Sequence, residues 1–150
     1  MHISYKGDYA LKATLELALV FPEEVLTLNE LARRLDIPFK FLEQILLDLK
    51  RAGFVESRRG IRGGYRLAKQ PSEINVGEVV RFIEGPVEPI ACAQKESAYK
   101  GCRDIHSCVL REIWIRVAEA THEIIDSVTF EELVNKIKGQ KKEPVANYNI

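Results

Sequence analysis

The chain has 150 residues, of which 46% are hydrophobic and 29% are charged, and its formal net charge is zero. These values are typical of a soluble globular protein with one ordinary domain, or a small domain with an extension, and no stretch approaches the roughly 18 apolar residues of a membrane span. Charged residues interrupt the apolar start and no small-residue cleavage site follows, so we expect an amphipathic helix there, not a signal peptide, in a protein of the reducing cytoplasm.

Three helices are expected in the first third of the chain. The first covers about residues 4–20 and is apolar on much of its surface. A capping box, Thr27-Leu-Asn-Glu30, opens a short second helix. Pro38 suits the first turn of a third helix over 38–52, which Gly53 closes. On this third helix we expect an apolar stripe formed by Phe41, Ile45, Leu46 and Leu49.

A β-hairpin and three more helices are expected in the remainder. Two β-type runs, FVES and GYRLA, flank the basic, glycine-rich segment RRGIRGG, a pattern that predicts a hairpin. Asn75-Val-Gly-Glu78 then has the pattern of a helix start, and Gly85 and Pro86 end that helix. From Val109 the three-four spacing of apolar residues predicts a helix of about five turns, and Thr129-Phe-Glu-Glu132 caps a last short one.

Helix, tight turn, helix and basic hairpin is the order of a winged helix-turn-helix. Residues 31–66 contain nine Lys/Arg against four Asp/Glu, a local charge of +5 that indicates an anionic partner such as DNA. The helix over 38–52 fits a major groove about 12 Å wide. There Gln44 can pair with adenine, Glu43 can accept from the cytosine amino group, and Lys40 suits a phosphate. An ordinary solvated helix face, or a protein-interaction module, remains an open alternative.

All three cysteines of the chain lie within the segment CAQKESAYKGCRDIHSC, as Cys92, Cys102 and Cys108. Thiolates are soft ligands, and this wide spacing suits an iron–sulfur cluster better than the closely spaced pairs of a structural zinc site. Cys108 begins the long helix, where the positive end of the helix dipole favours a thiolate. The alternatives are three free thiols without metal and a thiol redox switch.

Three cysteines leave a fourth coordination position to be filled. His106, between the last two cysteines, is a possible imidazole donor. Glu96 and Asp104 are local carboxylates, and a carboxylate from elsewhere in the fold or from a second subunit is a further candidate.

Several segments together resemble the dimeric iron–sulfur cluster transcriptional regulators typified by IscR and NsrR. They are MHISYKGDYALKATLELAL, LNELARRLDIPFKFLEQILLDLKRAGFVES, RRGIRGGYRLAK, INVGEVVRFIEGP and the cysteine segment that runs into CVLREIW, over roughly residues 1–135. The resemblance implies that the three cysteines ligate a [2Fe–2S] or [4Fe–4S] cluster, of which we favour [4Fe–4S], and that two subunits pair through residues 109–128. It also makes Glu43 and its neighbours base-reading residues, and Arg58, Arg59 and Arg62 the contacts of the wing.

The resemblance also points to the fourth ligand. The IscR branch supplies a histidine three residues after its last cysteine, where this chain has Arg111. The NsrR branch uses an aspartate near the N-terminus, donated by the partner subunit, and this chain has Asp8 in KGDYAL. We therefore prefer Asp8, with His106 as the second choice. Nine residues separate Cys92 from Cys102, where the named members have five.

The expected fold is mainly α with a small β-hairpin wing: a winged helix-turn-helix domain plus a long C-terminal dimerisation helix. We expect a DNA-binding domain in 1–84, a cluster-binding loop in 85–108, a dimerisation helix and final short helix in 109–138, and a flexible tail in 139–150. The expected function is transcriptional regulation, not catalysis. Binding to a double-stranded operator would respond to redox state, nitric oxide or iron–sulfur status, or alternatively to a cysteine thiol switch without a cluster.

Overall fold

The structure is a computed structural model that describes residues 2–94, 99, 101, 102 and 104–140. In this part of the chain it contains six α-helices, one two-stranded antiparallel sheet and two short 3-10 helices. The elements in chain order are α1 (Tyr5–Val20), α2 (Leu28–Leu35), α3 (Phe39–Arg51), β1 (Val55–Arg58), β2 (Gly64–Leu67), η1 (Pro71–Glu73), α4 (Val76–Glu84), η2 (Ala91–Ala93), α5 (Val109–Ser127) and α6 (Phe130–Gln140).

The helix starts follow the polar patterns of the sequence. The Thr27 side chain accepts a hydrogen bond from the Glu30 backbone, and the Glu30 carboxylate accepts one from the Thr27 backbone at 2.7 Å, so the predicted capping box is confirmed. Asn75 and Glu78 form the same reciprocal pair at the start of α4. Each pair satisfies two backbone N–H groups that the first turn of a helix leaves without intrahelical partners.

A tight turn sets α3 across α2. Asp36 adopts a left-handed conformation with φ of 52°, which ends α2, and Pro38 then occupies the N-cap of α3. Gly53, with φ of 77°, follows the C-cap residue Ala52 and closes α3, as was predicted for this glycine. The hairpin follows directly, with Val55 opposite Leu67 and Arg58 opposite Gly64.

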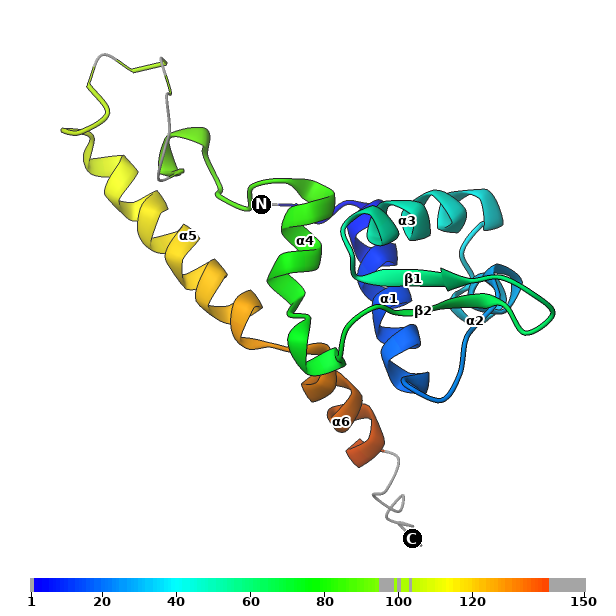
Figure 1. Ribbon diagram of the computed structural model, residues 1–150. Helices are drawn as coiled ribbons and strands as arrows, with labels where there is room; N and C mark the ends of the chain where they lie inside the picture. The colour runs from blue at the N-terminus through cyan, green and yellow to red at the C-terminus, as the bar shows by residue number, and fades with distance from the viewer. Residues whose placement is uncertain (1, 95–98, 100, 103, 141–150) are drawn as a thin grey trace, which may run out of the picture.

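The core is built around α1, which contacts α3, α4 and α6. Ala10, Ala13 and Leu17 of α1 are fully buried, and Phe130 of α6 is the largest fully buried side chain among the described residues. Figure 1 shows α5 projecting from this body, with its first residues, next to Cys108, at the outer end, whereas α6 returns to pack on α1.

One predicted buried residue is wrong. Phe41 is exposed, and Leu42 takes its place beside Ile45, Leu46 and Leu49 in the buried face of α3. The spacing of Leu42 from these residues, three, four and seven positions, is that of one helix face, whereas Phe41 lies a residue out of phase. Phe41 instead packs edge-on against Tyr9, with 5.7 Å between the ring centroids.

The functions assigned to the four predicted segments stay predictions. In the structure α4 ends at Glu84 and α5 begins at Val109, while Gly139 and Gln140 belong to α6. Residues 141–150, the larger part of the predicted tail, lie outside the described residues. No helix among the described residues is both long enough and apolar enough to cross a membrane.

Candidate functional site

The residues of the third helix that were predicted to contact DNA lie on the exposed face of α3. Lys40, Glu43 and Gln44 are all exposed, because the opposite face of the same helix supplies four leucine and isoleucine side chains to the core. An exposed polar face on the second helix of a helix-turn-helix is the part that enters the major groove.

Asp48 ties α3 to the start of α1. Its carboxylate lies 2.7 Å from Lys6 Nζ and 3.2 Å from Arg51 Nη1, and it accepts a hydrogen bond from Gln44 Nε2 at 3.2 Å. The hydrogen bond from Lys6 is the main cause that holds the pKa of Asp48 below its ordinary value. Since Lys6 is two residues from Asp8, the contact joins the exposed α3 face to the turn of α1 that carries Asp8.

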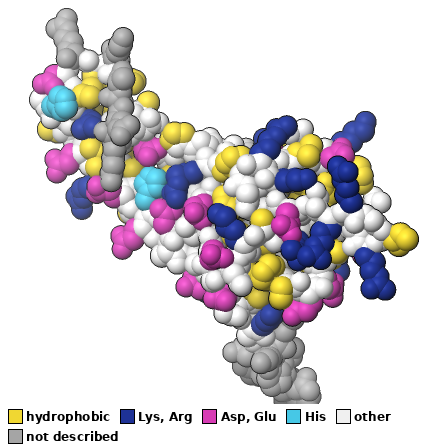
Figure 2. Space-filling model, viewed as in Figure 1, with side chains coloured by type: hydrophobic (Ala, Val, Ile, Leu, Met, Phe, Trp, Pro, Cys, Tyr) yellow, Lys and Arg dark blue, Asp and Glu magenta, His cyan; other side chains and the backbone are white. Residues whose placement is uncertain are grey.

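The hairpin carries exposed cations next to α3. Arg58, Arg59 and Arg62 are exposed, and none of them forms an ion pair with another residue in the described part of the chain. The Lys50 ammonium donates to Ser57 Oγ at 2.6 Å and so links α3 to β1. Figure 2 shows basic side chains gathered over the half of the molecule that holds the hairpin and α3, and acidic ones over the α4–α5 side.

The three cysteines lie in different environments. Cys92 is buried within η2, Cys102 is exposed, and Cys108 is half-buried at the N-cap of α5. All three are free thiols. Within the described residues, no three Cys, His, Asp or Glu side chains are gathered as they would be around a metal ion. One chain by itself therefore does not bring the predicted ligands together.

Arg111 contacts the backbone of the first and the last cysteine. Its Nε donates to the carbonyl oxygen of Cys92 at 2.7 Å, and its backbone N–H donates to the carbonyl oxygen of Cys108 at 3.1 Å. The Arg111 side chain thus ties the backbone of Cys92 to the first turn of α5, which Cys108 caps, while Cys102 is exposed. Three thiolates on such a frame are a donor set that suits iron.

The local candidates for a fourth ligand differ in whether their side chains already have hydrogen-bond partners. The Asp104 carboxylate accepts from the His106 backbone N–H at 2.8 Å, and hydrogen bonds from Ser107 and His106 hold its pKa below the ordinary value. The exposed His106 side chain lines a hollow of about 300 Å³ together with Cys108. Glu96 lies outside the described residues.

Asp8 lies in the first turn of α1, where its carboxylate is 2.5 Å from Lys12 Nζ. In Figure 1, α4 lies between α1 and the outer half of α5, and the first residues of α5, next to Cys108, are at its far end. No group of three possible metal ligands among the described residues joins Asp8 to the cysteines.

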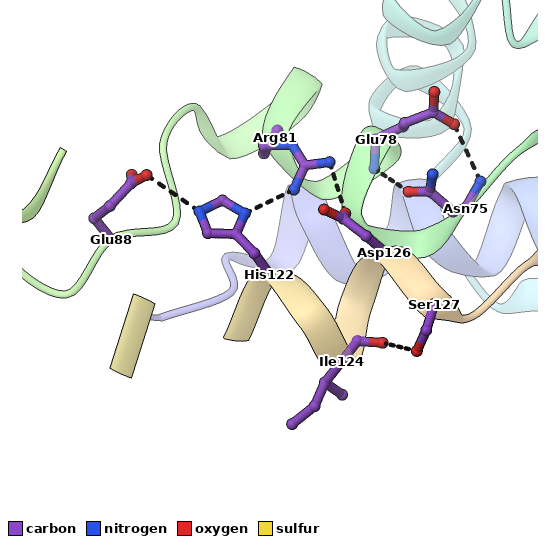
Figure 3. Close-up of polar contacts among 8 residues, drawn as sticks. All are labelled: Asn75, Glu78, Arg81, Glu88, His122, Ile124, Asp126 and Ser127. Atoms are coloured by element: carbon purple, nitrogen blue, oxygen red, sulfur yellow. Dashed lines mark hydrogen bonds and ion pairs between the residues drawn. The ribbon is translucent and has the colours of Figure 1, made fainter. Parts of the chain in front are cut away.

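A polar network that the sequence predictions missed holds α5 against α4 (Figure 3). Arg81 Nη2 lies 2.7 Å from Asp126 Oδ1, and Arg81 Nη1 lies 3.1 Å from His122 Nδ1. His122 Nε2 is in turn 3.2 Å from Glu88 Oε1. Because Arg81 only donates, His122 Nδ1 accepts and Nε2 carries the proton that is donated to Glu88. Glu88, His122, Asp126 and Arg111 line a cleft of about 620 Å³ along this side of α5.

A second missed contact joins α1 to α4. The Glu84 carboxylate, at the end of α4, accepts from the Ser4 backbone N–H at 3.0 Å and from Ser4 Oγ at 2.6 Å.

For Arg111 and His122 the sequence did contain a pattern that could have revealed that they face the protein. Positions 111, 115, 118 and 122 repeat at four, three and four residues, so they mark a second face of the long helix that packs inward.

The other face of α5 has no cover among the described residues. Its large apolar side chains are exposed, with Val109 at 77% of its full accessible area. The exposed set consists of Val109, Leu110, Ile113, Trp114, Val117 and Ile124. Monomeric proteins rarely leave so long an apolar stripe in water, which indicates an interaction surface.

Comparison with known proteins decides the family. Residues 3–136 match the Rrf2 family, which is described as iron-dependent transcriptional regulators. This chain belongs to the Rrf2 family. A Rhodobacter capsulatus Rrf2-like HTH-type transcriptional regulator is 43% identical over 138 residues, which cover 88% of this chain and 91% of that protein.

Two solved Rrf2-type structures share the fold. The structure of CymR, the global cysteine regulator of B. subtilis, superposes with a TM-score of 0.76 at 34% identity and covers 91% of this chain and 98% of its own. IscR of T. potens gives a TM-score of 0.78 at 29% identity, with 99% and 96% covered. The predicted winged helix-turn-helix fold is therefore confirmed. This Rrf2 chain is a DNA-binding transcriptional regulator and not an enzyme.

Proposed function

We propose that the chain is a homodimeric regulator whose operator binding is controlled by an iron–sulfur cluster on Cys92, Cys102 and Cys108. The observation that carries the proposal is the hydrogen bond from the Arg111 side chain, in the helix turn that Cys108 begins, to the Cys92 carbonyl. The bond ties the Cys92 backbone to that helix turn, which supports a shared role for Cys92 and Cys108. Among the two cluster types, [4Fe–4S] is preferred over [2Fe–2S].

Asp8 of a second copy of the chain would complete the ligand set, with His106 as the second choice. The exposed apolar face of α5 supports pairing of two copies through residues 109–128. Such pairing can bring the start of one α1 toward the cysteine segment of the other chain. A carboxylate is a harder and weaker ligand for iron than a thiolate, so this edge of the cluster would be open to nitric oxide or oxygen.

The contacts around Asp8 supply a path to the DNA-binding face. Lys6, two residues from Asp8, holds Asp48 of α3 at 2.7 Å. A change in where Asp8 is held would therefore shift the start of α1 and, through Lys6, α3. Two recognition helices must fit half-sites about 34 Å apart, so a small relative shift changes operator affinity.

Asp8→Asn tests the fourth ligand, because asparagine keeps the size of the side chain but loses its charge. We expect anaerobically purified variant protein to lose iron faster. Its affinity for operator DNA should be the same with and without the cluster. Lys12→Met is the matched control, since it breaks the 2.5 Å ion pair with Asp8 but leaves the carboxylate. The assignment fails if the Asp8 variant keeps the wild-type spectrum, iron content and affinity, or if Lys12→Met behaves like it.

A thiol redox switch without a cluster is the second candidate, and the exposed thiol of Cys102 favours it. Two thiols would form a disulfide and release two electrons and two protons to hydrogen peroxide, which is reduced to two molecules of water. Iron and sulfide analysis of protein purified without air separates the two candidates. The thiol switch would be established if the protein contained no iron or sulfide and if its DNA binding were lost on oxidation and restored by a dithiol.

A further inference from the structure

Ile61 is the most exposed large apolar residue described in the chain, at 107% of its full accessible area. It stands in the loop between β1 and β2, two residues from Arg59 and next to Arg62. A single exposed isoleucine is common on protein surfaces. This one, however, occupies the outermost turn of the element that carries the free arginines, and Figure 2 shows an apolar side chain at that tip among basic ones.

The turn holds Ile61 in a fixed position. The Gly63 N–H donates to the Gly60 carbonyl at 2.9 Å, so Ile61 and Arg62 are the two central residues of a closed turn. Gly60 has φ of 108°, and a Cβ at Gly63 would lie 2.5 Å from the Arg58 carbonyl oxygen, so the backbone folds this tightly only with glycine at both positions. A β-branched side chain is also stiff at χ1. The apolar tip is therefore preformed before any partner binds.

We propose that Ile61 enters the minor groove of the operator as an apolar wedge and makes the wing select deformable base steps. The inference rests on the proposed contact of the wing with DNA. Arginines favour a narrow minor groove, where the negative potential is strongest. With Arg59 and Arg62 on the groove edges, Ile61 faces its floor, and apolar side chains in that position partly unstack base pairs. Pyrimidine–purine steps unstack most easily, so they should lie beneath the wing.

The test uses full-length protein and operators selected from random-sequence duplexes. Ile61→Ala should lower affinity for the selected operator about tenfold, because most of the apolar side chain is removed. It should leave affinity for unselected duplexes and the salt dependence unchanged. Replacing the pyrimidine–purine step under the wing should weaken wild-type binding but not that of the Ile61→Ala protein. Fluorescence of 2-aminopurine at that step should rise on binding of wild-type protein only.

Two variants distinguish the apolar wedge of Ile61 from a phosphate contact of the wing. Arg62→Ala should weaken binding to all duplexes and reduce the salt slope by about one, as for a phosphate contact, while Ile61→Leu should keep operator affinity and unstacking. Ile61→Ala protein that unstacks and selects the same step as wild type would overturn the wedge and leave DNA binding by the wing intact. If Arg58, Arg59 and Arg62 could all be replaced without loss of affinity, the wing contact itself would be wrong, and the wedge with it.

Discussion

Replacing Arg111 with methionine is expected to loosen Cys92 while the fold stays intact. Methionine keeps much of the apolar stem but has no donor for the Cys92 carbonyl, which Arg111 Nε contacts at 2.7 Å. A hydrogen bond from a charged group contributes about 1.5–3 kcal/mol. Because Arg111 is only half-buried, we expect a loss near the lower limit, about 1.5 kcal/mol. The population in which the η2 turn opens should then rise about tenfold.

Two measurements detect the opening of the η2 turn. In protein without metal, hydrogen exchange of the Ala93 amide, which donates to the Ile90 carbonyl at 3.0 Å, should be about tenfold faster. In anaerobically reconstituted protein, loss of iron to a chelator should accelerate by a similar factor. Arg116→Met is the matched control, because Arg116 is exposed on the same helix and pairs with no side chain in the described ranges. Equal exchange and equal iron loss in the two variants would refute the reasoning.

Three further predictions concern the fold, the pairing of subunits and the contact of α1 with α3. Phe130→Ala should lower the free energy of unfolding by about 3–5 kcal/mol, seen as a large drop in the urea midpoint, because Phe130 is fully buried. Ile113→Glu should give a folded monomer in sedimentation velocity, whereas a persistent dimer would place the pairing elsewhere. Asp48 has a lowered pKa in the folded protein, caused first by Lys6. Its stabilising contact should therefore be complete above about pH 4 and be lost as the pH falls through the folded-state pKa. Asp48→Asn should show a shallower loss of stability over that acid range, and an identical pH profile would show that the contact does not form.

The sequence predicted the features that depend on residues close together in the chain. The capping box of Thr27 and Glu30 and the closing of α3 by Gly53 require only the spacing of a helix end, and both are confirmed. The error at Phe41 was one of phase. Phe41 and Leu42 are neighbouring apolar residues that both fit a hydrophobic run, but the spacing of one helix face to Ile45, Leu46 and Leu49 belongs to Leu42.

The contacts that organise the candidate site join residues far apart in the sequence. Ser4 and Glu84 are 80 positions apart, and Cys92 and Arg111 are 19 apart. No periodicity or cap pattern connects such pairs, since each depends on where packing brings two elements together. Recognising three cysteines as a candidate ligand set needed only residue chemistry. The contact between the Arg111 side chain and the Cys92 backbone could be found only from the fold.

The same contacts explain how a cysteine segment at the end of a projecting helix can matter to α3. Within one chain the route from α5 is indirect: it passes through Arg81 to α4, through Glu84 to Ser4, and only then along α1. From Asp8 the route is short, because Lys6 lies in the same turn and holds Asp48 of α3 directly. Control through Asp8 of a second chain would therefore act close to the DNA-binding face. It would also make that control depend on the dimer, since neither chain alone would hold both the thiolates and the carboxylate.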